Sequence, residues 1–157
     1  MRKIIYTRPD GGLSIVHPAF NTIGEVEGFT TADAELRAWN NLITKGITPR
    51  WLDASEIPTD RTFRDAWVDT GIITVDMTKA KEIHKNKLRS LRKPLLEALD
   101  AKYLRADEIG DVVEKSRIAT LKQTLRDITA ITAVTGAVTP EQLKVAGISI
   151  LSNFNTQ

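Results

Sequence analysis

The chain has 157 residues, 41% hydrophobic and 27% charged, which is the composition of a folded protein of one domain or of a small module with an extension. Its 22 Lys and Arg against 20 Asp and Glu leave a net charge of +2, too small to indicate nucleic acid as a partner. The absence of cysteine excludes disulfide scaffolds, thiol catalysis and cysteine-ligated zinc. No apolar run is long enough to span a membrane, and the first residues lack a signal-peptide core.

The first segment of the chain predicts a β-hairpin over residues 3–17. Two short apolar runs, 3–7 and 13–16, flank the sequence Pro9-Asp10-Gly11-Gly12. Proline sets one turn dihedral, and the Asp-Gly-Gly sequence tolerates positive φ, so this segment favours a tight turn. Residues 19–30 show no period and are predicted to form a loop.

A helix is predicted over 32–45, followed by a third strand at 50–53. Thr30 and Thr31 provide a helix cap, and Gly46 is suited to end the helix. The apolar residues recur at spacings of three and four, which predicts one apolar stripe, with Trp39 in the core: Ala32, Leu36, Trp39, Leu42 and Ile43. Residues 1–60 are therefore interpreted as a small ββαβ module.

A second β-hairpin, or an extended arm, is predicted to link this module to the rest of the chain. The segments 63–69 and 72–75 flank Thr70-Gly71, and from Asp76 the apolar pattern becomes helical. Charge changes at the same place, because residues 1–76 hold 8 basic and 11 acidic residues while residues 77–157 hold 14 and 9. We therefore divide the chain into segments 1–60, 61–76 and 77–157.

Residues 77–129 predict a helical hairpin, so the whole chain is assigned to the α+β class. Pro94 lies within the first helix and is expected to kink or split it. Gly110 and Asp111 are suited to end one helix and to cap the next. Residues 130–138 are predicted to be a loop, and Thr139-Pro140 predicts the start of a short C-terminal helix.

The hairpin also provides the predicted protein interface. Two helices alone cannot shield both of their faces, so the hairpin either lies against the N-terminal module or packs on another chain. Residues 79–93 contain seven basic residues and one acidic residue, without interleaved aromatic residues, which favours a solvated or protein-docking face over a nucleic-acid site. The predicted interface consists of Leu88, Leu91, Leu95, Leu99, Ile118, Leu121 and Leu125, with Lys85, Arg89 and Arg92.

The sequence predicts no catalytic, cofactor or metal site. His17 and His84 lie in different modules without a surrounding motif. The Asp10-Gly11-Gly12 segment lacks the Gly-Lys-Ser/Thr sequence of a phosphate loop. The carboxylates of residues 60–69 are too loosely spaced for a metal-binding loop. We therefore expect a protein that is not an enzyme and needs no cofactor.

Four segments in order along the chain resemble a known group of proteins. They are residues 2–18 with Arg8-Pro9-Asp10-Gly11-Gly12, residues 60–67 with Arg61-Thr62-Phe63-Arg64, residues 75–80, and the helical segments between 94 and 128. In these segments the chain is similar to small tail-region proteins of tailed phages and prophages. The resemblance spans most of the chain except residues 19–50, and it assigns no individual site residue.

This resemblance implies a structural protein of the virion tail or baseplate region. Its partners would be other tail, baseplate or fibre subunits, with possible self-association. The residues themselves indicate no membrane contact and make nucleic acid a less favoured partner. It would be found in the virion tail and, during assembly, in the host cytoplasm. The alternatives are a transient assembly chaperone for the tail or tail fibre, and a small regulator that binds nucleic acid or a host factor.

Overall fold

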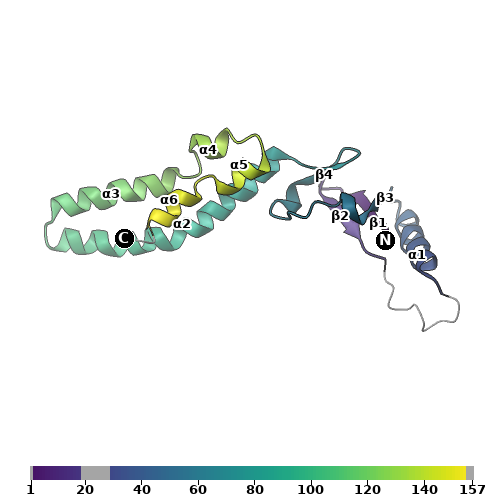
Figure 1. The fold of residues 1–157 in the computed structure, drawn as a ribbon. Coiled ribbons are helices and arrows are strands. Elements are labelled where there is room, and N and C mark those ends of the chain that lie inside the picture. Colours follow the sequence, from purple (N-terminus) through teal and green to yellow (C-terminus); the bar gives the residue numbers. More distant parts are fainter. Residues whose placement is uncertain (1, 19–28, 155–157) are drawn as a thin grey trace. The chain divides into compact units, whose positions relative to one another are not determined.

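The computed structural model describes residues 2–18 and 29–154, which form two compact units, Met1–Asp76 and Met77–Gln157. Every described strand belongs to the first unit, and the second is helical (Figure 1). The predicted α+β class is therefore confirmed. Most of the loop predicted at 19–30 falls on residues 19–28, outside the described residues.

A three-stranded antiparallel sheet forms the centre of the first unit. It comprises β1 (Arg2–Thr7), β2 (Leu13–Val16) and β3 (Arg50–Asp53), in the order β2-β1-β3. The predicted hairpin and the third strand are confirmed. Gly11 lies in the turn with a φ of 74°, in the left-handed region that favours glycine.

One face of the sheet packs against a second, smaller hairpin. This hairpin comprises β4 (Trp67–Asp69) and β5 (Ile73–Val75), and it is preceded by two 3-10 turns, η1 (Ala54–Glu56) and η2 (Arg64–Ala66). Side chains alternate along a strand, and the side chains on this face form an apolar core of Ile5, Leu13, Leu52 and Trp67.

An ion pair joins β3 to β4 beside this core. Arg50 donates two hydrogen bonds to Asp69, at 3.0 and 2.7 Å. These hydrogen bonds are the main reason that the pKa of Asp69 lies below its ordinary value. The small hairpin is therefore held to the sheet by both apolar and charged contacts.

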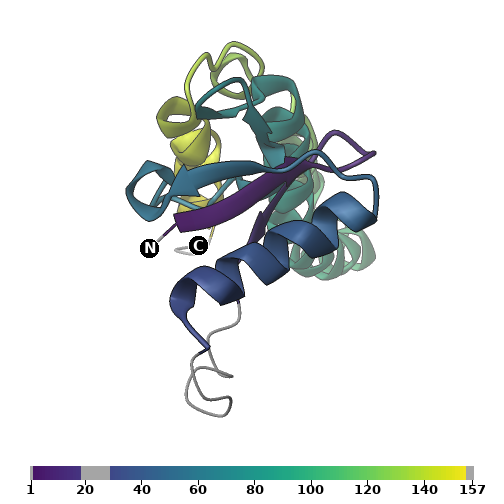
Figure 2. The same ribbon diagram turned by 90° about the vertical axis from the view of Figure 1, so that its right-hand side faces the viewer.

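Helix α1 (Thr31–Thr44) lies along the other face of the sheet (Figure 2). The rings of Trp39 and Trp51 are stacked, with centroids 4.8 Å apart. Thr30 and Asp33 form a reciprocal cap at the start of the helix, and Gly46 follows its end with a φ of 71°. The predicted helix is thus confirmed with its caps.

The buried stripe of α1 differs from the prediction. The buried residues are Ala34, Glu35 and Leu42, whereas Leu36 and Ile43 are 56% and 51% exposed. The interpretation of the apolar stripe as the core-facing side of the helix was wrong for Ala32, Leu36 and Ile43. The stack of Trp39 on Trp51 and the hydrogen bond from Arg2 to Glu35 turn the helix roughly a quarter of a turn from the predicted orientation.

The second unit is built on a long helical hairpin. Helix α2 (Met77–Glu108) and helix α3 (Val112–Asp127) pack side by side, and three short helices follow them. These are α4 (Thr132–Thr135), α5 (Pro140–Val145) and α6 (Ile148–Phe154), and all three pack on α2 (Figure 1).

The helix ends follow local rules. Gly110 has a φ of 70°, and the carboxylate of Asp111 accepts a hydrogen bond from the backbone of Glu114, so the predicted reversal is confirmed. Thr139 caps α5 as predicted. The prediction that 130–138 is entirely loop was wrong, because α4 lies within it.

Helix α2 is continuous through Pro94, so the alternative that this proline splits the helix was wrong. Proline removes the hydrogen bond to the carbonyl of Ser90. Both Ser90 and Pro94 are exposed, so water can satisfy that carbonyl without breaking the helix.

Candidate interaction surface on the helical hairpin

The predicted leucine stripe divides into buried and accessible residues. Four of its seven members are at most 7% exposed and lie inside the unit, so they are not available to a partner: Leu88, Leu99, Ile118 and Leu125. Leu95 and Leu121 are half-buried, and Leu91 is 45% exposed. The stripe is therefore mainly the internal core of the hairpin.

The short C-terminal helices supply cover that two helices alone would lack. Leu143 of α5 is fully buried, and Leu151 of α6 is 6% exposed. The buried imidazole of His84 lies 2.8 Å from the carbonyl oxygen of Ala146, at the end of α5. Gly147, with a φ of 78°, follows directly and allows the chain to turn into α6 beside Leu88.

The predicted basic residues serve different purposes. Arg92 donates hydrogen bonds to the carbonyl oxygens of Leu125 and Arg126, at 3.1 and 2.5 Å, and so satisfies carbonyls at the end of α3. Lys85 donates to Glu82 at 2.7 Å, and Arg89 donates to the side chain of Asn86 at 2.6 Å. Arg92 is therefore a structural residue, whereas Lys85 and Arg89 lie on the surface of α2.

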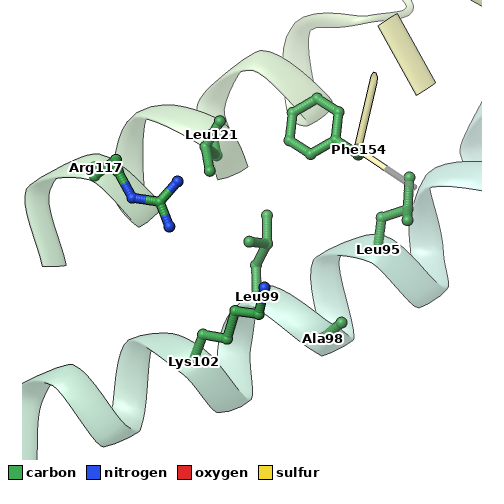
Figure 3. Close-up of a pocket in the computed structure, with 7 residues that line it drawn as sticks. All are labelled: Leu95, Ala98, Leu99, Lys102, Arg117, Leu121 and Phe154. Carbon is green, nitrogen blue, oxygen red and sulfur yellow. The ribbon is translucent and has the colours of Figure 1, made fainter. Parts of the chain in front are cut away.

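A small apolar pocket lies where α2, α3 and the end of α6 meet (Figure 3). Its volume is about 70 Å³, far below the several hundred Å³ of a pocket for a drug-sized ligand. Seven residues line it: Leu95, Ala98, Leu99, Lys102, Arg117, Leu121 and Phe154. We call this the α6-end pocket.

Two cations stand at one side of the α6-end pocket, opposite Phe154 (Figure 3). Arg117 donates two hydrogen bonds of 2.7 Å to Glu114, which lower the pKa of that carboxyl, with a smaller contribution from the charge of Lys102. Lys102 itself makes no hydrogen bond or ion pair with any described residue. Two positive charges therefore line the pocket, and the negative charge of Glu114 is bound to one of them.

The closed end of the hairpin exposes four aliphatic side chains. Leu104 is 61% exposed, Ile109 79%, Val112 73% and Val113 82%. We call these residues the tip patch. These residues were not predicted from the sequence. Polar residues are usual at a chain reversal, so the apolar Ile109 and Val112-Val113 on either side of the predicted reversal could have indicated an exposed apolar surface.

Within residues 2–18 and 29–154, no cluster of three or more His, Asp or Glu side chains is placed to hold a metal ion. None of the described helices is both long enough and apolar enough to cross a membrane. Comparisons with family models, curated proteins and solved structures found no match.

Proposed function

We propose that this chain is a structural protein of a phage tail or baseplate region, which joins tail or fibre subunits through protein contacts. Two lines of support lead to this proposal. The resemblance of its sequence segments to tail-region proteins suggests the setting. The tip patch is the observation that carries the role, because four exposed aliphatic side chains gather at one end of the hairpin.

The tip patch is mostly exposed to solvent rather than packed within its own unit. Its side chains are 61–82% exposed, so they contribute little to the core. Burying a large aliphatic side chain against a partner would gain about 1.5–3 kcal/mol. Helix α2 holds 32 residues, so the patch lies about 48 Å from the start of that helix. A long helical arm with an apolar end is well suited to reach and contact another subunit.

A protein that connects subunits needs surfaces that contact them, and it does not need a reactive group. Within the basic run of residues 79–93, Lys81 and Arg92 satisfy backbone carbonyls at the ends of α4 and α3. Less of the basic cluster therefore remains to contact phosphate groups, which makes the regulator that binds nucleic acid the less favoured alternative.

The proposal is tested by the protein content of purified particles. We expect the wild-type chain at a fixed copy number in virions analysed by mass spectrometry. The double variant Ile109→Ser, Val113→Ser should fold normally and be absent from the particle. A matched control, Val138→Ser with Val145→Ser, changes two valines that are 72% and 70% exposed elsewhere in the unit and should be incorporated.

Absence of the wild-type chain from purified particles would overturn the proposal. If the chain is then found bound to an unassembled tail or fibre subunit, the assembly chaperone becomes the better assignment. Equal incorporation of the tip variant and the control would remove the tip patch from the contact.

A further inference from the structure

We infer that the α6-end pocket receives an aliphatic side chain from an acidic helix of a partner protein. This inference rests on the proposed function, since it names the chemistry of one partner of the connecting protein. It uses a different surface from the tip patch and can be tested separately.

The shape of the site favours a helix as the occupant. Helix α6 already packs on α2 and buries Leu151, and its last described residue, Phe154, forms one wall of the pocket together with Leu121 of α3. Beyond Phe154, no described element covers the side of the α2–α3 hairpin on which α6 lies (Figure 1). A partner helix placed in line with α6 would continue the packing that α6 begins.

The size of the pocket limits what enters it. An apolar cavity of about 150 Å³ in another protein holds a molecule of benzene, and this pocket has about half that volume. It therefore admits one aliphatic side chain. Leu99 and Leu121 face each other across the pocket and would contact that side chain from both helices (Figure 3).

The charges around the pocket select an acidic partner. Lys102 has no hydrogen bond or ion pair among the described residues, and Arg117 shares its charge with Glu114 alone. A carboxylate on the partner helix, one turn away from the inserted side chain, would pair with the positive charge of Lys102. A second copy of this surface would instead bring Lys102 and Arg117 against like charges, so a partner helix with Asp or Glu residues fits better.

The test uses two designed helical peptides and the full chain. Both peptides carry leucines on one face, and the other face carries glutamates in one peptide and lysines in the other. Titration calorimetry should show the glutamate peptide binding at least tenfold more tightly than the lysine peptide. Comparable affinities would overturn the inference, because the charges around the pocket would not select the partner.

Variants locate the binding on the chain. Lys102→Glu should weaken the glutamate peptide at least fivefold, while the matched control Lys87→Glu, at an exposed position of α2 outside the pocket, should leave it unchanged. Ala98→Trp places a large side chain at an exposed helix position that lines the pocket, and it should abolish binding without loss of helical content. Equal effects of Lys102→Glu and Lys87→Glu would overturn the inference.

Two other occupants are distinguished by the same measurements. Markedly tighter peptide binding by a chain that ends at Phe154 would assign the pocket to this chain's own residues. Self-association that Ala98→Trp removes would assign it to a second copy. Either result overturns the inference. A chain that is present in virions but ignores both peptides keeps the proposed function and loses only this inference.

Discussion

The two ends of the α2–α3 hairpin differ in what covers them. Near the start of α2, the short helices α4, α5 and α6 pack on it, and Leu88 and Leu125 are completely buried. At the closed end, Ile109, Val112 and Val113 are 73–82% exposed. Apolar residues occur at both ends, so cover by other elements, rather than composition, decides which end is core and which is exposed.

A pair of identical substitutions gives the largest expected contrast between these ends. Leu125→Ala should lower the free energy of unfolding by about 3–4 kcal/mol, because it opens a cavity in the core. Leu104→Ala at the exposed end should change it by less than about 0.5 kcal/mol. Chemical denaturation followed by circular dichroism measures both. Similar losses would mean that the closed end is as well packed as the rest.

Two glycines with the same backbone conformation test the packing more finely. Gly147 and Gly110 have φ values of 78° and 70°, so alanine costs about 1–2 kcal/mol in backbone strain at either position. A Cβ at Gly147 would also lie 3.2 Å from Ile128, whereas at Gly110 it meets nothing within 4 Å. Gly147→Ala should therefore destabilise by roughly 1 kcal/mol more than Gly110→Ala. Equal decreases in melting temperature for the two variants would show that the side chains around Gly147 move aside without an energetic cost.

Two arginines of α2, Arg92 and Arg89, test whether such a side chain stabilises the fold by capping a helix or only by its charge. Arg92→Met removes two hydrogen bonds to carbonyls at the end of α3 and should cost about 1 kcal/mol of unfolding free energy. Arg89→Met removes only a hydrogen bond to Asn86 on the surface of the same helix, and should cost less than about 0.5 kcal/mol. Urea denaturation of the two variants tests this difference, and a reversed order would contradict the capping role.

The smallest effect is expected from the exposed pair at the α6-end pocket. The hydrogen bonds from Arg117 lower the pKa of Glu114, so the pair stabilises the fold above the ordinary value of 4.5 and loses this contribution as pH falls through the lowered value. Arg117→Met should raise the pKa of Glu114 toward 4.5. Side-chain NMR titration measures this change, and an unaltered midpoint would show that the hydrogen bonds are not maintained in solution.

Local rules explain which elements could be predicted from the sequence. The turn at Gly11, the cap at Thr30 and the reversal at Gly110 depend on a few neighbouring residues, and each was predicted correctly. The orientation of α1 was not, because it depends on a stack between Trp39 and Trp51, which are distant in sequence. Helix α6 was missed because its apolar pattern is short and its packing partner, α2, lies at least 40 residues earlier.

The candidate site was predicted only in part, for the same reason. Leu95, Leu99 and Leu121 were included in the predicted interface and do line the pocket. Lys102 and Arg117 were not, because the dense basic run at 79–93 dominated the charge pattern. Their proximity arises from the folding of α3 back along α2, which no spacing within either helix reveals.

The length of α2 has a mechanical consequence. From Met77 to Glu108, the continuous helix of 32 residues is about 48 Å long. A rotation of about 10° at the base would displace the far end by roughly 8 Å, which is close to the distance between two packed helices. A small change in the angle at which the helix begins would therefore be enough to move the tip patch at its far end by about that distance.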